Sequence, residues 1–416
     1  MSDLDTVRAE VQAWLAEHWD PDRSLLEWRS LLVDSGWGCP SWPTDRFGRG
    51  LRADQGKVVA EEFQRVGAVS VASGVGMGLV APTLLAHGTD DQLARLLRPI
   101  VTGEHRWCQL FSEPGAGSDL AGLTTRADRD GEEWIVSGQK VWNSGAHRAA
   151  FGILLARTDW EVPKHKGISY FAIAMDQSGI EVRPLKQSNG HASFNEVFFS
   201  EARVEARNLI GNTGDGWRIA LTTLTHERAA ALNTGRRPRV RTEAGRCVVE
   251  ANAESAEYYK TYEWYPQRAG RTDLAQPRAR ETGQAADPVV RQELMVLHAQ
   301  VETTKWSNGR VASARATGRP AGPEGSLSKL NGSRIARLAN GVHTTIAGAS
   351  GMLSGSDAPL NGVITEILLS TPAMSIAGGT DEIQHNIIGE RVLGLPKEPG
   401  SDADLPFREV RTNLRG

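Results

Sequence analysis

The periodicity of apolar residues changes twice along this chain, and these changes constrain its fold more than any other feature. In the first hundred residues, apolar side chains recur every three or four positions, as Val7, Val11 and Leu15 do, which is typical of amphipathic helices. In the next hundred, the apolar runs are short and bounded by Gly, Asp and Pro, as in strands. Helical periodicity then returns. We predict an α+β protein with an N-terminal helical domain (1–108), a middle antiparallel β domain (109–210), a C-terminal helical bundle (211–400) and a tail (401–416).

The same patterns place individual elements. Short apolar or alternating runs predict strands at residues 134–136, 152–155, 168–174, 181–184 and 196–199. Longer stretches with helical spacing predict helices at residues 217–232, 288–317, 327–347, 366–374 and 387–396.

Residues 236–280 do not follow these patterns. Glycines and a proline interrupt the preceding helix, and four of the chain's five tyrosines lie between Tyr258 and Tyr265. We interpret the segment as an irregular excursion with a solvated basic face rather than a dedicated binding patch. Its basic run consists of Arg236, Arg237, Arg239 and Arg241.

Composition narrows the classes of function. The chain has 416 residues and a net charge of -3, so its overall charge favours neither nucleic acid nor an anionic membrane as a partner. The three cysteines, Cys39, Cys108 and Cys247, form no C-x-x-C pair, which favours a reducing compartment and disfavours structural zinc. The N-terminus lacks the regions of a signal peptide, and no apolar run reaches membrane-spanning length. We therefore expect a cytoplasmic protein with no membrane anchor, nucleic-acid partner or metal.

A glycine-containing run, SEPGAGSD at residues 112–119, is the first candidate binding motif. The small residues at 115–117 let the backbone approach a planar or phosphorylated ligand, and Ser112 and Ser118 place hydroxyl groups beside that opening. Neither this run nor GVGMGL at residues 74–79 has the G-x-G-x-x-G spacing of a dinucleotide-binding fold. The P-loop pattern is also absent. Alone, the run would indicate only a turn, but it occurs with other motifs.

Four motifs occur in the order found in the acyl-CoA dehydrogenase family, which this chain resembles from about residue 36 to residue 396, with a break across 236–280. The family fold agrees with the three domains predicted from periodicity. The resemblance implies FAD as cofactor, an acyl-CoA thioester as substrate and an electron-transfer flavoprotein as partner. It also implies a homodimer, a homotetramer or a heterotetramer. The motifs are QLFSEPGAGSDLAG (109–122), GQKVWNSGAH (138–147), SFNEVFF (193–199) and IAGGTDEIQHNIIGERVLGLP (376–396).

The resemblance also implies which residues surround the flavin. Trp142 would cover the flat ring and Ser144 would hydrogen-bond to it. An aromatic face suits such a ring, and hydroxyl donors tune its reduced, negatively charged form. The other residues implied at the cofactor or the neighbouring substrate are Gln109, Phe111, Ser112, Gly117, Ser118, Thr380 and Glu382.

The implied reaction is α,β-desaturation: a base removes a proton from the carbon next to the thioester carbonyl, and a hydride passes from the next carbon to flavin N5. In many family members the base is a glutamate directly before the Gly-Thr of the C-terminal motif, where this chain has Gly378. A second branch, similar to isovaleryl-CoA and actinobacterial steroid or branched acyl-CoA dehydrogenases, carries it within a Leu-x-x-Glu-Arg pattern on an early helix of the bundle. Residues 224–228 (LTHER) match that pattern. We predict that Glu227 is the base.

The expected catalytic set has three members. Burial would raise the pKa of Glu227 and make it a better proton acceptor, and Arg228 could fix the helix or pair with a neighbouring charge. The backbone N–H of Gly378 would polarise the thioester oxygen, a role that glycine keeps. Branches with the base on this helix handle branched or bulky acyl groups, including steroid side chains. The resemblance therefore favours a role in fatty acid or steroid degradation.

One family feature is missing, and two alternatives stay open. The Arg-x-x-Phe-Gly pattern, whose arginine reaches the FAD pyrophosphate of a neighbouring subunit, is not found. The first alternative is a flavin oxidase or monooxygenase of the same fold; the second is a non-catalytic subunit of a heteromeric dehydrogenase, against which Glu227 and Trp142 argue. The arginines that could replace the missing one by charge are Arg271, Arg278, Arg280 and Arg291.

Overall fold

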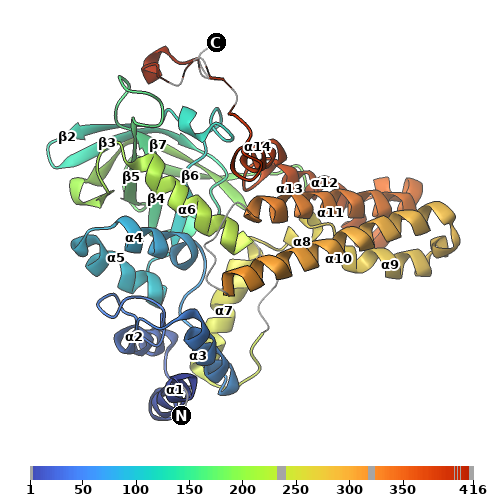
Figure 1. Cartoon of the computed structure of the whole chain (residues 1–416), viewed down its shortest axis with the longest axis horizontal. Helices are drawn as coiled ribbons and strands as arrows, with labels where there is room; N and C mark the ends of the chain where they lie inside the picture. The colour runs from blue at the N-terminus through green and yellow to red at the C-terminus, as the bar shows by residue number, and fades with distance from the viewer. Residues whose placement is uncertain are drawn as a thin grey trace.

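The computed structural model describes residues 3–231, 240–316, 324–397, 399–400, 402 and 404–411, without the side chains at 228–231, 315–316 and 324. The N-terminal helices lie at one end of the molecule, next to a middle domain built on one large sheet, and the C-terminal helices pack beside both (Figure 1). Two long helices of this last group, α10 (Pro288–Ala316) and α11 (Glu324–Ala347), lie side by side and project to the side (Figure 1). The predicted α+β class and the order of the three domains are confirmed.

The N-terminal helices have strong local signals at their ends. At the start of α5, Thr89 Oγ1 accepts a hydrogen bond from the Gln92 N–H (3.3 Å), and the Gln92 side chain accepts one from the Thr89 N–H (3.0 Å). The Gln92 amide also donates to the carbonyls of Arg207 (2.8 Å) and Leu209 (2.7 Å), which fixes α5 to the middle domain. These elements are α1 (Asp3–His18), α2 (Leu25–Ser35), α3 (Ala53–Arg65), the π-helical turn η1 (Gly76–Val80), α4 (Ala81–His87) and α5 (Asp90–Thr102).

The sheet of the middle domain is mixed rather than purely antiparallel as predicted. Its order is β6-β7-β3-β2-β4-β5-β8, and β1 pairs with β4 in parallel. The strands β2 and β4 also meet in parallel, at Arg126 and Arg157. The reason is the route of the chain: the β2–β3 hairpin separates β1 from β4, so both enter the sheet in the same direction. The strands are β1 (Trp107–Leu110), β2 (Arg126–Asp130), β3 (Glu133–Lys140), β4 (Phe151–Arg157), β5 (Ile168–Ala174), β6 (Ile180–Leu185), β7 (Phe194–Glu205) and β8 (Leu209–Ile210).

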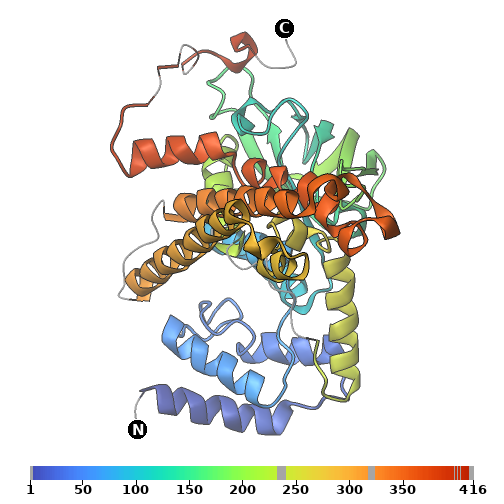
Figure 2. The same cartoon turned by 90° about the vertical axis from the view of Figure 1, so that its right-hand side faces the viewer.

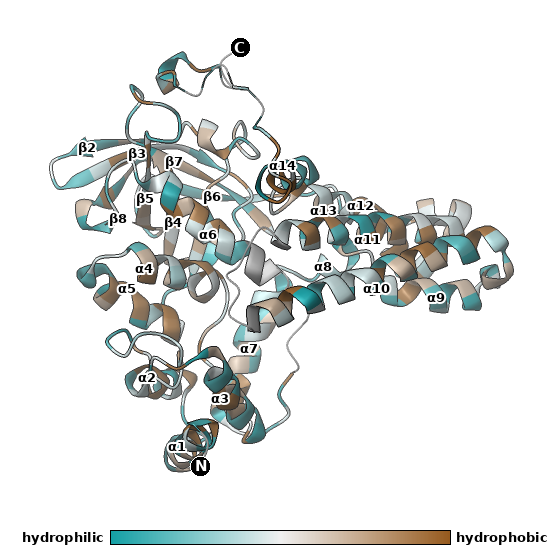
Figure 3. Ribbon diagram, in the orientation of Figure 1, coloured by the Kyte–Doolittle hydropathy of each residue, from teal (hydrophilic) through white to brown (hydrophobic). Residues whose placement is uncertain are grey.

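Every predicted strand is present, and the three unpredicted ones lacked a pattern. β2 reads RADRD, in which only the alanine is buried, so it has no apolar alternation. β8 has only two residues and β1 only four. Figure 3 shows the contrast between the polar β2–β3 end of the sheet and the hydrophobic strand β4.

Three of the predicted C-terminal helices, at 217–232, 288–317 and 327–347, are present within the described residues, and the other two differ from their predicted bounds. The helix predicted at 366–374 is divided into α12 and α13, because Pro372 cannot donate the next helical hydrogen bond. The last helix ends at Arg391, so VLGLP is not helical. The helices are α6 (Gly216–Ala231), α7 (Arg246–Lys260), α8 (Tyr265–Arg268), α9 (Thr272–Glu281), α10 (Pro288–Ala316), α11 (Glu324–Ala347), α12 (Val363–Ser370), α13 (Pro372–Ile376) and α14 (Asp381–Arg391). The short turns are η2 (Leu120–Gly122), η3 (Ala146–Arg148), η4 (Ala206–Asn208), η5 (Gln284–Ala286), η6 (Gly348–Met352), η7 (Gly355–Asp357), η8 (Pro359–Gly362) and η9 (Phe407–Glu409).

One stretch of the described residues, Pro359–Arg391, is long and apolar enough to cross a membrane by length and composition alone. It comprises η8, α12, α13 and α14, and extended backbone at Ala377 separates the last two helices. A match of this kind is weak evidence for a membrane span, because core helices pass the same test.

The interpretation of residues 236–280 as an irregular segment is wrong for its described part. Here α7, α8 and α9 form, and α7 starts against the N-terminal helices and runs toward the C-terminal ones (Figures 1 and 2). Cys247 and Val248 are buried in the same core cluster as Trp28. An ion pair between Arg29 of α2 and Glu254 (3.1 Å) holds the middle of α7 against the same helices. Arg236, Arg237 and Arg239 of the basic run lie outside the described residues.

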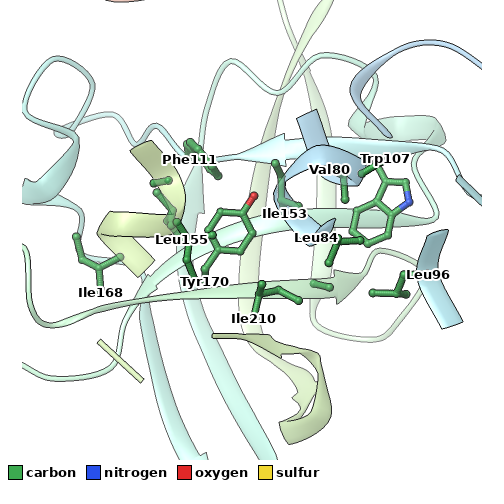
Figure 4. Close-up of a cluster of buried hydrophobic side chains, with 14 of the residues drawn as sticks. Val80, Leu84, Leu96, Trp107, Phe111, Ile153, Leu155, Ile168, Tyr170 and Ile210 are labelled. Atoms are coloured by element: carbon green, nitrogen blue, oxygen red, sulfur yellow. The ribbon is translucent and has the colours of Figure 1, made fainter. Parts of the chain in front are cut away.

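The main core cluster lies between the sheet and the helices α4, α5 and α6. Figure 4 shows Trp107, Ile153 and Tyr170 of the sheet packed together with Val80 and Leu84. This cluster joins the N-terminal helices, the sheet and α6, and it therefore sets the position of α6 relative to the motifs of the middle domain.

The docking of α7 can be tested with a pair of neighbouring valines. Val248 is 1% exposed and Val249 is 65% exposed. We expect Val248→Ala to lower the free energy of unfolding by on the order of 2 kcal/mol, because it leaves a cavity in the N-terminal core. Val249→Ala should change it by less than about 0.5 kcal/mol. Urea unfolding followed by tryptophan fluorescence measures both; equal effects would contradict the assignment of α7 to this core.

Candidate active site

A buried ion pair joins the two glycine-containing motifs of the middle domain. Lys140, at the end of β3, donates from Nζ to Glu113 Oε1 (2.8 Å) and to the Phe111 carbonyl (2.9 Å). Glu113 also accepts hydrogen bonds from the N–H groups of Thr124 (2.7 Å) and Thr125 (2.8 Å). The two charged side chains are 0% and 3% exposed. Charges at this depth need a partner and hydrogen bonds, so the pair fixes each motif relative to the other.

The surroundings keep Glu113 ionised. Burial alone would raise the pKa of its carboxyl, but Lys140 and the hydrogen bonds from Thr125 and Thr124 outweigh burial and lower the pKa to about 2. Burial lowers the pKa of the Lys140 amine, and Glu113 opposes that shift. Because Nζ has both a carboxylate and a carbonyl as acceptors, we assign a charged ammonium to Lys140 at neutral pH.

Further hydrogen bonds attach a third motif to the two that this ion pair joins. The Val141 N–H donates to the Ser112 carbonyl (2.9 Å), and Asn143 Nδ2 donates to the Gln109 carbonyl (2.7 Å). Asn143 and Asn195 exchange backbone hydrogen bonds of 3.0 and 3.1 Å, and Asn195 Nδ2 donates to the Asn143 carbonyl (2.8 Å). The motifs SEPGAGSD, GQKVWNSGAH and SFNEVFF therefore form one rigid unit, which we call the frame.

Trp142 combines a strained backbone with an exposed ring. Its φ of 65° lies in the left-handed region, which is unusual for a bulky residue. The side chain is 57% exposed, whereas its neighbours Val141 and Asn143 are buried and hold the backbone in place. Its ring packs edge-on against Phe194, with centroids 5.6 Å apart. An exposed indole on a rigid frame offers a face to a planar ligand.

Helix α6 carries Glu227 to this frame. Ile219 and Thr223 are fully buried against the sheet, and the Thr223 hydroxyl hydrogen-bonds to the Tyr170 hydroxyl of β5 (3.1 Å). Glu227 follows Thr223 by one helical turn and therefore lies on the same side of α6. Gln109 Nε2 donates to Glu227 Oε2 (3.1 Å). The structure thus brings the predicted base together with the first residue of the first motif.

Tyrosines from the segment after α7 complete the surroundings of this frame. Burial raises the pKa of Tyr262, and a hydrogen bond from the Ser144 hydroxyl opposes the shift. Burial raises the pKa of Tyr265 to about 12; Arg268 opposes this shift, and Tyr262 and Glu227 add to it. The two tyrosine rings are 4.7 Å apart. Ser144 and Glu227 are therefore both next to phenol groups.

The glycines before α14 adopt left-handed conformations, with φ of 68° at Gly378 and 84° at Gly379. The Gln384 amide donates to the carbonyls of Gly378 (3.1 Å) and Gly379 (3.3 Å). These contacts hold the turn against α14. The role of the Gly378 N–H beside a thioester stays a prediction.

The residues after these glycines form the start of α14. Thr380 Oγ1 accepts a hydrogen bond from the N–H of Ile383 (3.3 Å), which caps the helix. Asp381 is bound by Lys329 (2.8 Å) and Arg337 (2.6 Å), and these contacts outweigh burial and lower its pKa. Glu382 is exposed. The cofactor roles of Thr380 and Glu382 stay predictions.

The other predicted cofactor residues differ in exposure. Gly117 and Ser118 are exposed and Ser112 is half-buried, as suits a loop that faces a ligand. The ring of Phe111 instead lies in the core, edge-on to Tyr170 with centroids 5.9 Å apart (Figure 4). Only the backbone of Phe111 is therefore available to a ligand.

The predicted arginines do not lie together at one site. Arg228 lies on α6, but its side chain is outside the described part of the chain. Of the arginines considered as replacements for the missing family arginine, Arg271 pairs with Asp273 (2.8 Å) and Arg278 is 8% exposed. The remaining two, Arg280 and Arg291, are exposed.

Sequence reasoning missed the residues that hold the frame together. Glu113 and Lys140 each lie inside a recognised motif, and a charged residue among small or apolar neighbours was a usable signal for a buried pair. The roles of Asn143 and Tyr262 had no such signal, because they depend on contacts between distant segments.

The residues around Trp142 fit a planar cofactor. The indole is exposed, hydroxyl groups lie near it, and the buried Asn143 Oδ1 has no hydrogen-bond partner among the described residues. Among the same residues, no group of three or more His, Cys, Asp or Glu side chains could hold a metal ion. An exposed ring and hydroxyl groups on one rigid frame, with a half-buried carboxylate hydrogen-bonded to it, are the parts expected of an oxidoreductase with a flat organic cofactor.

Comparison with known proteins agrees with this class. The models of the acyl-CoA dehydrogenase N-terminal, middle and C-terminal domains match residues 4–104, 108–202 and 270–393. Acyl-CoA dehydrogenase IpdE1 of Mycobacterium tuberculosis is 34% identical, over 96% of this chain and 99% of the relative. Acyl-CoA dehydrogenase FadE34 of the same organism is 35% identical, over 88% of this chain and 46% of the relative.

Solved structures show the same fold. A protein described as the Tcur3481-Tcur3483 steroid ACAD has a TM-score of 0.65 at 27% identity, covering 95% of this chain and 98% of that one. The ChsE4-ChsE5 complex from Mycobacterium tuberculosis has a TM-score of 0.63 at 25% identity, covering 96% and 99%. The chain belongs to the acyl-CoA dehydrogenase family and is therefore an oxidoreductase, and the family implies FAD as its cofactor.

The buried pair can be tested through its cation. We expect Lys140→Met to lower the free energy of unfolding by about 3 kcal/mol or more, because Glu113 then stays buried without its counter-charge. Lys186→Met removes an exposed lysine of the same domain and should cost less than about 0.5 kcal/mol. Urea unfolding with the far-ultraviolet signal of the sheet measures both, and similar values for the two variants would show that the pair is not a structural link.

Proposed function

We propose that the chain holds FAD against Trp142 and Ser144 and desaturates the α,β-bond of an acyl-CoA thioester with Glu227 as the base. The hydrogen bond between Gln109 and Glu227 carries this proposal. The Gln109 carbonyl is in turn bound by Asn143, the residue after Trp142. The proposed base and the proposed flavin-facing indole therefore belong to one hydrogen-bonded network.

Bound FAD supplies the acceptor for the hydride. Gln109 donates to the Glu227 carboxylate, which favours its charged form and fixes its orientation before the proton is taken. Glu227 is half-buried, and its charge acts on the neighbouring Tyr265. The N–H of Gly378 donates to the thioester oxygen as negative charge develops there.

The relatives favour a bulky acyl group. One solved relative is described as a steroid ACAD, and a base on α6 is typical of branches with branched or steroidal acyl groups. We propose a branched or polycyclic acyl-CoA as substrate, in fatty acid or steroid degradation in the cytoplasm. We further propose an electron-transfer flavoprotein as electron acceptor.

Exposed apolar side chains support an oligomer. Trp306 on α10 is 67% exposed, and Ile376 and Leu393 on either side of α14 are 65% and 66% exposed. Apolar side chains of this size become buried where a partner chain covers them. Both solved relatives named above carry two protein names, so we propose a heteromer with a second chain of the same family; a homodimer or homotetramer is the alternative.

The function is tested first with the purified protein. We expect a flavin absorption spectrum that is bleached anaerobically by branched or polycyclic acyl-CoA thioesters more rapidly than by straight-chain ones. Slow recovery of colour in air, with rapid recovery on adding an electron-transfer flavoprotein, supports the dehydrogenase. Rapid recovery in air alone would instead identify an oxidase. Protein that takes up no flavin, alone or on reconstitution, would exclude the proposal for the isolated chain.

The base is tested with Glu227→Gln. We expect this variant to keep FAD but to lose bleaching by at least about a hundredfold, because the amide cannot accept the proton. Glu132→Gln is the matched control, since Glu132 has a side chain that is 95% exposed in the same chain. Anaerobic stopped-flow absorbance at the flavin maximum measures the rates. A variant that bleaches as quickly as the unmodified enzyme would remove Glu227 as the base.

A further inference from the structure

The last described residues of the chain return to the middle domain. Residues 402 and 404–411, here named the C-terminal strap, lie beside the sheet domain, away from the C-terminal helices that precede them (Figures 1 and 2). Phe407 is 0% exposed and Val410 is 6% exposed. The N–H groups of Phe407 and Arg408 donate to the carbonyls of Val162 (2.9 Å) and Trp160 (3.1 Å). The strap is therefore packed and hydrogen-bonded rather than loose.

Phe407 covers a buried arginine. The guanidinium carbon of Arg157 lies 3.3 Å from the centroid of the Phe407 ring, and Arg157 is 0% exposed. Arg157 donates to the carbonyls of Ala121 (2.7 Å), Leu123 (3.1 Å) and Lys164 (3.1 Å). An aromatic face over a desolvated cation stabilises it, so the strap favours the arginine geometry that binds these carbonyls.

A second contact reaches the same turn. Lys164 Nζ lies 3.2 Å from Asp119 Oδ2 and 3.5 Å from Asp402 Oδ2. The lysine thus links the strap to Asp119, while Arg157 links it to Ala121 and Leu123. Both links end within residues 119–123, the turn that directly follows Gly117 and Ser118.

The strap contacts the back of this turn and leaves its front open. Gly117 and Ser118 are exposed, and a Cβ built on Gly117 would meet nothing within 4 Å. On the side before this pair, Ala116 is buried and exchanges backbone hydrogen bonds with Glu113 (3.0 and 3.1 Å). On the side after it, the 119–123 turn and the contacts behind that turn restrain where the backbone points.

We propose that the C-terminal strap is a positioning element for the cofactor loop, in which Phe407 and Asp402 act through Arg157 and Lys164 to hold the 119–123 turn and so fix Gly117 and Ser118 against the flavin. This inference rests on the proposed function, because it takes FAD as the ligand of that loop. Its residues touch no substrate or cofactor; they act through the turn.

The test uses the full-length FAD-loaded enzyme and two matched pairs of variants. Phe407→Ala removes the ring over Arg157, and Leu405→Ala removes an exposed apolar side chain of the same strap. Asp402→Asn removes the charge facing Lys164, and Asp404→Asn removes an exposed charge nearby.

We expect Phe407→Ala to release FAD on the order of tenfold more rapidly on dilution, and Asp402→Asn to do so by a smaller factor. Leu405→Ala and Asp404→Asn should leave the rate of FAD release unchanged. Phe407→Trp keeps an aromatic ring at this position and should release FAD at the rate of the unmodified enzyme, unlike Phe407→Ala. Flavin fluorescence follows the release.

Hydrogen exchange of the loop separates positioning from general stability. We expect faster exchange at residues 115–125 in Phe407→Ala and Asp402→Asn, with unchanged exchange in β6 and β7. Unchanged FAD release and unchanged loop exchange in both variants would overturn the inference, and if Phe407→Ala does not fold, Asp402→Asn decides alone. If the unmodified chain holds no FAD, the proposed function fails, yet loop exchange in the flavin-free protein still tests the strap.

Discussion

The ion pair between Glu113 and Lys140 is the constraint on which the candidate site depends. Two opposite charges withdrawn from water must stay together, since separating them would leave each one desolvated. Because one belongs to a glycine-containing loop and the other to the end of β3, neither segment can shift alone. This rigidity is also what allows Trp142 to keep a left-handed backbone, since the buried residues on both sides of it cannot relax.

The proposed base does not belong to the frame that holds the flavin-facing residues. Glu227 is carried by α6, and its position relative to the sheet is set by the contacts of Thr223 with Tyr170 and Thr83 one turn earlier. The amide of Gln109 spans the remaining distance. The chemistry is therefore divided between two elements that the main hydrophobic core aligns (Figure 4), so core packing near Tyr170 contributes directly to the geometry of the site.

Much of the fold was predictable because local patterns and tertiary packing agree. The capped helices, the apolar strands and the motif that contains Glu227 all follow from short stretches of sequence. The failures have long-range causes. The parallel pairing of β1 with β4 depends on the path of the β2–β3 hairpin, and the burial of Phe111 depends on Tyr170, a residue far along the chain. Tyr262 likewise lies in the segment that was interpreted as irregular, and its contact with Ser144 joins residues far apart in the chain.

The crossing of α7 has a consequence for how the protein is made. The N-terminal core around Trp28 includes Cys247 and Val248, which follow the entire middle domain in the sequence. A ribosome must therefore translate well past the sheet before the first domain can close its core, although domains usually fold in the order in which they emerge. Until then, the surface of α2 that α7 will cover stays exposed to water and to chaperones. The middle sheet, with its internal ion pair, is the unit able to fold first.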